Sequence, residues 1–270
     1  MNNMSRNMNY FFYVEYFQKP DGHIKDLNEN DFQIRNREIS NFRFKEPSPL
    51  NKLADAKGYS SFDLYTTYPG LLIGMGNMHD YSAEGAIKCG FSFDFVTGMP
   101  YIPGSSLKGM LRSYFPGSVG DCEKKQELTE YIQQMLPGKD IGILESKIFN
   151  NGDIFLGAYP IQSSESMLEM EFITPHKSKF KNPIPINILK VKPNVGFRFS
   201  FILRESGGAN SEEKTEIFKK ILLDMGIGAK TNVGFGMLTE KREEEAPKCA
   251  NKICKNKVDN TRTVHGKVLS

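Results

Sequence analysis

The sequence lacks the marks of membrane-spanning and secreted proteins. No apolar run reaches the length that crosses a bilayer. The first residues contain no basic segment followed by an apolar stretch, so we expect no signal peptide. The four cysteines, Cys89, Cys122, Cys249 and Cys254, are scattered and do not form the pattern of a disulfide framework. These absences predict a cytoplasmic protein that does not associate with a membrane.

An excess of charge of one sign is also missing. The 270 residues carry a formal net charge of only +3, with 25% charged and 39% hydrophobic residues. This composition fits a soluble globular protein. A role in binding nucleic acid would therefore depend on local basic patches and not on the overall charge.

The familiar motifs of catalysis and cofactor binding are absent. The sequence contains no G-x-S-x-G, H-E-x-x-H or paired-carboxylate motif. The glycine-rich stretch 226–236 lacks a third dinucleotide-binding glycine at Thr231, and Ala229 stands where a Walker A loop needs glycine. Cys249, Cys254 and His265 supply only three zinc ligands. We expect neither a metal site nor a cofactor.

Composition and pattern divide the chain into three parts. Residues 1–61 are expected to form an N-terminal extension packed on the core, in which residues 10–17 suit either a strand or a buried helix. Residues 62–241 form the main domain. Residues 242–270 form a polar, lysine-rich tail that we expect to be flexible.

The main domain alternates predicted strands and helices. Strands are expected at 62–68 with a continuation at 71–73, and at 88–96, 153–159, 168–174, 195–204 and 235–241. Helices are expected at 105–115, 122–136 and 211–225. The last helix has a capping box of Asn210 and Glu213 and ends at Gly226. If 88–96 and the basic segment 174–193 are insertions, this order predicts an α+β, modified ferredoxin-like (RRM-like) domain.

The start of the first helix in the main domain has the ingredients of an anion site. Pro100 and Pro103 stiffen the chain, and Gly104 permits a turn. Ser105 or Ser106 is suited to the N-cap position. Free backbone N–H groups and hydroxyls at a helix start can bind an anion. An ordinary capped amphipathic helix explains the same residues.

Within that helix, the spacing separates an apolar face from a basic one. The residues that recur at helical spacing toward a core are Leu107, Met110, Leu111 and Tyr114. Lys108 and Arg112 are four residues apart and share another face. Both cations lie near the candidate anion site in sequence, although solvated cations on a helix surface are common.

Two further stretches have chemistry that suits a polyanion. Residues 174–193 contain His176, Lys177 and Lys179 and no acidic residue, which fits either RNA or DNA contact or a solvated loop. In the glycine-rich stretch, the backbone around Lys230 and Thr231 can approach a phosphate closely. The same glycines would also allow a tight turn to pack on the first helix of the domain.

The two long motifs together resemble a known family. Residues 93–109, FDFVTGMPYIPGSSLKG, and residues 226–236, GIGAKTNVGFG, are similar to the RAMP superfamily of CRISPR proteins. Residues 68–76, 172–176 and 183–192 are similar to the subunit-six family of the Cmr (type III-B) complexes. The resemblance covers about residues 62–241.

The resemblance implies an RNA-binding subunit of a crRNA-guided effector complex that targets RNA in antiviral defence. Its partners would be crRNA, target RNA and neighbouring Cmr subunits, namely the repeated backbone subunit and subunit one. It would lie toward the crRNA 3′ end, where a β-hairpin thumb, here assigned to the basic segment, helps to shape the guide–target duplex. The residues expected to contact RNA are Gly104, Ser105, Ser106, Lys108, Arg112, His176, Lys177, Lys179, Gly228, Lys230, Thr231, Asn232 and Gly234.

The catalytic residue of the family has no clear match in this sequence. Its target-cleaving backbone subunit uses an aspartate in the loop after its first strand. The corresponding loop here offers Asp80 and Glu84, but Lys88 stands about where that aspartate is expected. We therefore expect a non-catalytic subunit. The alternative is an endoribonuclease that processes crRNA with His79 or His176, or cleaves target RNA with Asp80.

Overall fold

A computed structural model describes residues 6–18, 27–44, 51–52, 58–76, 79, 83–150, 152–161, 165–174 and 185–242. The predicted tail from residue 243 lies outside this range. So do several residues singled out by the sequence, which are Asp80, His176, Lys177, Lys179, Cys249, Cys254 and His265.

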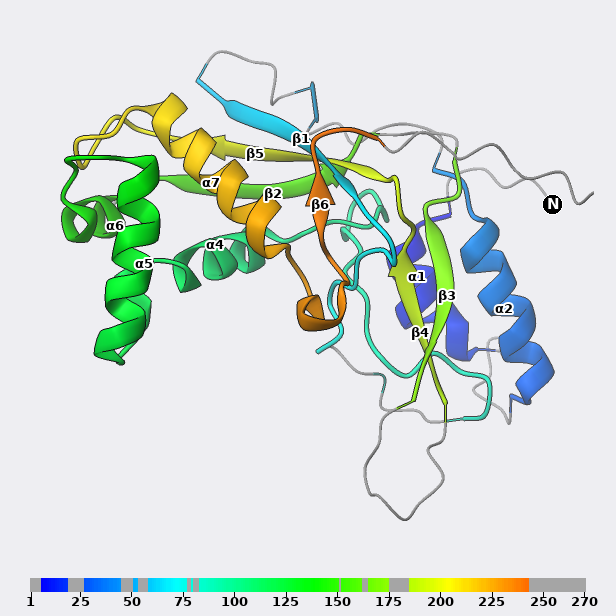
Figure 1. Cartoon of the computed structure of the whole chain (residues 1–270). Coiled ribbons are helices and arrows are strands. Elements are labelled where there is room, and N and C mark those ends of the chain that lie inside the picture. The colour runs from blue at the N-terminus through cyan, green and yellow to red at the C-terminus, as the bar shows by residue number, and fades with distance from the viewer. Residues whose placement is uncertain are drawn as a thin grey trace, which may run out of the picture.

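The chain is an α+β protein, as predicted, built on an antiparallel four-stranded sheet (Figure 1). The sheet consists of β1 (Ser60–Thr66), β2 (Ile154–Pro160), β5 (Gly196–Ile202) and β6 (Leu238–Thr239). Their spatial order is β2-β5-β1-β6, so the first strand of the main domain lies between the last two. Every pairing within the sheet is antiparallel.

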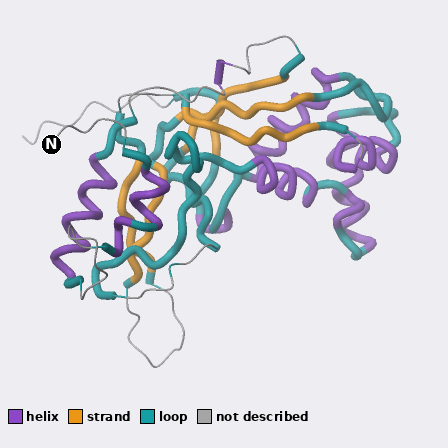
Figure 2. Tube along the Cα trace, turned by 180° about the vertical axis from the view of Figure 1, so that it is seen from behind, coloured by secondary structure: helices purple, strands orange, loops and turns teal. Residues whose placement is uncertain are grey.

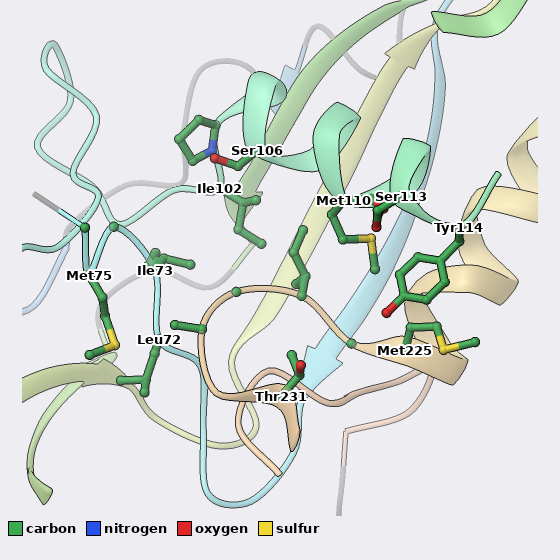
Figure 3. Close-up of a pocket in the computed structure, with 17 residues that line it drawn as sticks. Leu72, Ile73, Met75, Ile102, Ser106, Met110, Ser113, Tyr114, Met225 and Thr231 are labelled. Atoms are coloured by element: carbon green, nitrogen blue, oxygen red, sulfur yellow. The ribbon is translucent and has the colours of Figure 1, made fainter. Parts of the chain in front are cut away.

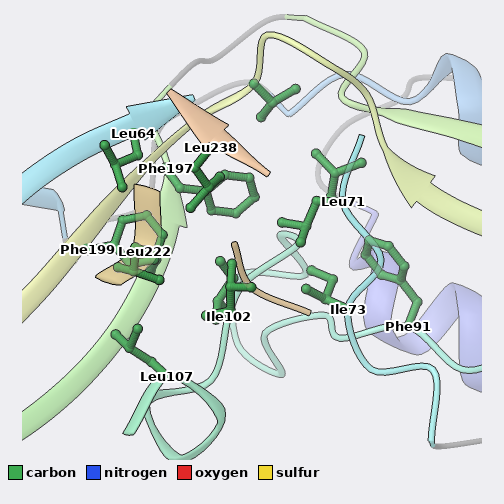
Figure 4. Packing of buried hydrophobic residues seen from close by; sticks show 14 of the residues in the cluster. Leu64, Leu71, Ile73, Phe91, Ile102, Leu107, Phe197, Phe199, Leu222 and Leu238 are labelled. Atoms are coloured by element: carbon green, nitrogen blue, oxygen red, sulfur yellow. The ribbon is translucent and has the colours of Figure 1, made fainter. Parts of the chain in front are cut away.

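Helices α4 (Gly104–Ser113) and α7 (Ser211–Met225) bury one face of this sheet. The strand predicted at 195–204 is confirmed as β5, in which Phe197, Phe199 and Phe201 are fully buried. The ring of Phe218 from α7 packs against Phe201, with centroids 5.3 Å apart. Figure 4 shows this core continuing from the sheet into the segment that follows β1.

Helix α7 begins and ends where the sequence predicts. The side chain of Asn210 accepts a hydrogen bond from the N–H of Glu213, and the Glu213 carboxylate accepts one from the N–H of Asn210. Gly226 ends the helix with a φ of 69°, a conformation that favours glycine.

Two further helices lie between α4 and β2 in the chain. Helix α5 (Cys122–Met135) confirms a prediction, and it follows the short 3-10 turn η2 (Pro116–Ser118). Helix α6 (Ile141–Asn150) was not predicted, although Ile141, Leu144 and Ile148 are buried at helical spacing. The Asp140 side chain stabilises the start of α6 by accepting a hydrogen bond from the N–H of Ile143.

The N-terminal residues are helical and pack onto the same core. They form α1 (Met8–Tyr13), the 3-10 turn η1 (Glu15–Phe17) and α2 (Glu29–Asn41), so the helical alternative for residues 10–17 is correct. Helix α2, which was not predicted, has a capping box of Asn28 and Asp31. Figures 1 and 2 show these helices beside a second sheet, in which β3 (Leu168–Ile173) pairs antiparallel with β4 (Ile186–Val191).

Three strand predictions were wrong or too long. Residues 88–96 form no strand. Phe91 and Phe93 are buried, but Phe95 lies in a turn and is 82% exposed. The closing strand predicted at 235–241 is limited to Leu238–Thr239, because residues 234–236, at the end of the glycine-rich stretch, form a turn. The predicted continuation at 71–73 is an isolated bridge between Leu71 and Val191.

Within the described residues, no helix combines the length and apolarity needed to cross a membrane.

A buried ion pair joins α7 to the ends of β2 and β5. The Lys214 ammonium is fully buried and lies 2.7 Å from the Asp153 carboxylate. It also donates to the Arg204 carbonyl at 2.7 Å and to the Ser206 hydroxyl at 3.0 Å. The second Asp153 oxygen accepts from the N–H of Arg204 at 2.8 Å. The three acceptors match the three donors of a lysine ammonium, so the Lys214 side chain is fully used in contacts that hold the fold together.

We predict that Lys214→Met destabilises the protein by about 3–5 kcal/mol, because it leaves the Asp153 carboxylate buried and unpaired. Chemical denaturation of the purified chain measures this change. The control is Lys220→Met, which removes an exposed pair with Asp224 on the same helix and should cost about 0.5 kcal/mol or less. Equal losses in the two variants would contradict the assignment.

The β3–β4 pair carries its own buried cation. The Lys190 side chain is 6% exposed, and its ammonium lies 2.7 Å from Glu171 and 3.4 Å from Glu169. The hydrogen bond from Lys190 lowers the pKa of the Glu171 carboxyl below its ordinary value. The ion pair therefore contributes stability above the pKa of the unfolded glutamate, and this contribution is lost as the pH falls through the folded pKa.

We predict that Lys190→Met raises the pKa of Glu171, because the hydrogen bond that favours the charged carboxylate is removed. NMR titration of the Glu171 carboxyl carbon measures the shift. Lys192→Met is the matched control, since the Lys192 ammonium donates to the Ser166 hydroxyl instead. An unchanged Glu171 pKa in Lys190→Met would refute the role of this pair.

Candidate functional site

The start of α4 is held against β2 by direct backbone contacts. Ile102 and Ala158 exchange two hydrogen bonds of 2.9 Å, which anchors the segment before the helix. A Cβ atom at Gly104 would collide with the carbonyl oxygen of Phe155, so only glycine fits there. The predicted serine cap was wrong. Pro103 occupies the N-cap position and Ser105 and Ser106 lie inside the helix, so no side chain caps its first N–H groups.

The glycine loop, residues 226–236, lies against the segment that follows β1. The N–H of Ala229 donates to the carbonyl of Leu72 at 2.9 Å, and the N–H of Gly236 donates to that of Gly70 at 2.8 Å. Gly228 has a φ of 96°, and a Cβ atom there would collide with the Leu72 carbonyl oxygen. The loop therefore needs glycine for both its conformation and its packing.

The crown of the glycine loop presents backbone donors to solvent. Lys230 has a left-handed conformation with φ 60° and precedes the 3-10 turn η3 (Thr231–Val233). Among the described residues, the N–H groups of Gly228, Lys230, Thr231 and Asn232 have no hydrogen-bond acceptor. Successive backbone N–H groups in such a turn form a concave site for an anion. Lys230 is exposed and adds a positive charge to it.

A cleft of about 470 Å³ separates the glycine loop from α4. Its walls come from α4, the segment after β1 and the glycine loop (Figure 3). The predicted residues Ser106, Gly228 and Thr231 line it. The two motifs, which are more than 100 residues apart in sequence, therefore meet at one place in the fold.

The two cations of α4 do not line this cleft. The Lys108 ammonium lies over the Phe155 ring, 5.8 Å from its centroid. Arg112 lines a second cleft of about 640 Å³, whose other walls come from α5 and α6. Lys125 and Glu145 also line that cleft. The four-residue spacing correctly predicts a shared face, but this face is not the one that meets the glycine loop.

Lys230 lies near Cys89, on the side of the glycine loop that faces β4. Burial raises the pKa of the Cys89 thiol, and the positive charges of Lys230 and Lys88 act in the opposite direction. Cys89 packs against Leu72 and Phe235 in a small apolar cluster. Lys230 is thus held close to the folded body, although its side chain is exposed.

Comparisons with known proteins identify the family of this chain. The family model of the RAMP superfamily matches residues 63–239, which is more than half of the chain. The chain belongs to the RAMP superfamily. The matched residues run from β1 to β6 and include both motifs that form the cleft.

The similar proteins include subunits named Cmr6 and a chain of a type III-B Cmr complex. The CMR subunit Cmr6 of Saccharolobus solfataricus is 28% identical over 159 residues, covering 55% of this chain and 47% of that protein. This chain thus matches about half the length of that relative. A chain in the cryo-EM structure of the type III-B Cmr-beta bound to cognate target RNA has 25% identity and a TM-score of 0.53, covering 87% of this chain and 81% of that chain.

The crystal structure of Cmr6 from Pyrococcus furiosus is similar at a TM-score of 0.44 and 21% identity, covering 68% of this chain and 98% of that chain.

In this RAMP protein, the histidine that the sequence offered for catalysis lies in an aromatic cluster. The His79 ring lies 4.6 Å from the Phe12 ring and 4.7 Å from the Phe17 ring, measured between centroids. Tyr16, whose pKa is raised by burial, packs there too and donates to the Asn36 side chain. His79 is therefore half-buried against α1 and η1 and does not line the cleft.

Sequence reasoning missed the third wall of the cleft and part of its interior. The segment 72–76 was treated as a strand end and loop, yet it faces both motifs. Met110 and Tyr114 were assigned to the core, but they are half-buried and line the cleft. Only Leu107 and Leu111 on that helix are fully buried. The helical spacing alone could not separate these two rows, because they are adjacent on the helix surface.

We predict that Gly228→Ala disrupts the glycine loop, because its positive φ and its contact with the Leu72 carbonyl both exclude a Cβ atom. The amide of Ala229 should exchange with solvent faster, as measured by hydrogen exchange. The control is Gly109→Ala on α4, where a Cβ atom meets open space and should stabilise the helix by about 1 kcal/mol. Unchanged exchange in Gly228→Ala would contradict the proposed packing constraint.

Proposed function

We propose that this RAMP protein is a non-catalytic, RNA-binding subunit of a cytoplasmic type III-B crRNA-guided effector complex. Membership of the RAMP superfamily and the similarity to Cmr6 support the type of complex. The observation that carries RNA binding is the set of unpaired N–H groups at the crown of the glycine loop, beside Lys230 and facing α4. These groups suit the phosphate backbone of crRNA toward its 3′ end.

The phosphate contacts extend over both sides of α4 in this proposal. The glycine loop and the uncapped first turn of α4 supply backbone donors, while Lys108 and Arg112 supply charge from the other face of the helix. An RNA strand that runs along α4 can reach both groups, since Arg112 lies in the last turn of this helix. Such contacts are independent of base sequence, as a subunit that serves many guides requires.

The described fold suits this role. The order β1, α4, β2, β5, α7, β6 and the sheet order β2-β5-β1-β6 support a ferredoxin-like domain, with α5, α6 and the β3–β4 pair as insertions. We assign β3–β4 as the thumb hairpin. The connection between these strands contains His176, Lys177 and Lys179, which would contact the guide–target duplex.

The partners in this proposal are crRNA, target RNA and the neighbouring Cmr subunits, with the backbone subunit and subunit one as neighbours. The similar cryo-EM structure is that of a type III-B Cmr-beta bound to cognate target RNA, which supports RNA as a partner here. His79 packs among aromatic rings outside the cleft, which counts against a catalytic role for this residue.

We predict that Lys108→Ala combined with Lys230→Ala weakens crRNA binding in the assembled complex. Each lost phosphate contact should reduce the slope of log K against log salt by about one unit, so the slope should fall by about two. Filter binding across a salt series measures this change. Lys124→Ala combined with Lys147→Ala is the control, since it removes the same charge from exposed positions on α5 and α6, away from α4 and the glycine loop.

Unchanged affinity and salt slope in the first variant would contradict the proposed RNA site. The endoribonuclease alternative is tested by incubating the purified chain with labelled RNA, with and without divalent metal. Cleavage that is lost in His79→Ala, His176→Ala or Asp80→Ala would overturn the non-catalytic assignment.

A further inference from the structure

The interior of the cleft between α4 and the glycine loop is apolar and unusually rich in methionine. Met75, Met110 and Met225 come from three separate parts of the chain and all line it. Figure 3 shows Met110 and Met225 on either side of Tyr114, with Met75 across the cleft. Methionine is flexible and polarisable, and it packs well against flat aromatic groups.

The polar groups of the cleft lie around this apolar interior. The hydroxyl-bearing residues Ser106, Ser113 and Tyr114 line it from α4. Among the described residues, the Ser106 and Tyr114 hydroxyls have no hydrogen-bond partner. On the opposite wall, Gly228 and Thr231 provide the unpaired N–H groups described above. The cleft therefore combines an apolar slot, free hydroxyls and an anion-binding rim.

This division of chemistry restricts what can occupy the cleft. A phosphate would lose its hydration against the methionines without gaining a charged partner, so it belongs at the rim. A purely apolar side chain would leave the hydroxyls and the rim N–H groups without partners. The occupant that fits all three features is flat, has an apolar face and a hydrogen-bonding edge, and carries an anionic group. A nucleotide has this combination, and the cleft volume lies within the usual range for small-molecule sites.

We propose that the cleft holds a single unpaired nucleobase of the bound RNA, with the adjoining phosphate on the N–H groups of the glycine loop. This inference rests on the proposed function and assigns one base to a site that otherwise contacts only backbone. The base lies between Met75 on one wall and Met110 on the other, and its edge reaches the hydroxyls of Ser106 and Tyr114. The base must be unpaired, because a paired base has no free edge and cannot leave its stack to enter a closed slot.

The test uses the full chain in a complex reconstituted with RNAs that each carry 4-thiouridine at one position. Irradiation links a thiolated base to the protein groups that it touches, and peptide mapping finds the linked residues. We expect one position of the RNA to link to α4 or to the segment after β1, at Met110, Tyr114 or Met75. Neighbouring positions should link elsewhere.

Met110→Glu should abolish this link and weaken RNA binding about tenfold, as expected for the loss of one stacked base. Met110→Leu should weaken RNA binding less than Met110→Glu, because it keeps an apolar side chain of similar size. The charge control is Gln134→Glu on the exposed surface of α5, which should change neither the link nor RNA binding. An RNA with an abasic nucleotide at the linking position should bind the wild-type protein more weakly than the intact RNA does. The loss of affinity should be smaller for Met110→Glu, because this variant no longer contacts the base.

Several results would overturn the inference. If RNA binds with the predicted salt slope but no position links to the slot, the nucleobase site is wrong and the proposed function stands. If RNA does not bind at all, both are wrong. If uridine monophosphate alone competes for the slot as tightly as the RNA strand binds, the occupant is a free nucleotide. If the residues of the slot are inaccessible to solvent in a complex assembled without RNA, a neighbouring protein fills the slot.

Discussion

Direct contact between backbones is the constraint on which the cleft depends. The glycine loop lies on the segment after β1 through the bonds from Ala229 to Leu72 and from Gly236 to Gly70. The start of α4 lies on β2 in the same way, where Gly104 approaches the Phe155 carbonyl. These approaches leave no room for a Cβ atom, so the spacing between the three walls is set by the main chain. Side chains inside the cleft are then free to serve a ligand.

The stability of the domain comes from elsewhere. The phenylalanines of β5 and the apolar face of α7 form the core, and the buried pair of Lys214 and Asp153 fixes the first half of α7 against β2 and β5. Helix α7 is thus held along its length. This fixes the position of its last residue, Met225, and of the glycine loop that follows. The chain thus separates the residues that stabilise the fold from those that line the cleft.

The sequence predicted those elements whose signals are local. The capping box of Asn210 and Glu213 defines α7 without help from the rest of the chain, and the alternation in β5 reflects burial of one face. By contrast, residues 88–96 also alternate apolar and polar side chains but form no strand. Their backbone makes only separate contacts, such as the bond from the N–H of Lys88 to the Asn187 carbonyl of β4 and the bridge of Phe93 to Pro100. The meeting of the two motifs could be expected from the order of strands and helices. The position of Lys108 and Arg112 could not, since helical spacing groups residues on a face without saying what that face meets.

The arrangement of donors at the cleft also has a physical reason. Backbone N–H groups lose less conformational freedom than a lysine side chain when they bind a phosphate. In the proposed RNA site, the glycine loop would therefore position the strand, and Lys230 would add attraction over a longer range. An apolar slot beside such a rim adds affinity that salt does not screen, because stacking and burial involve no counterions. Placing both on one rigid frame lets the phosphate contacts fix the register of the strand. Whichever base lies beside the slot is then selected by position, and its identity matters little to three flexible methionines.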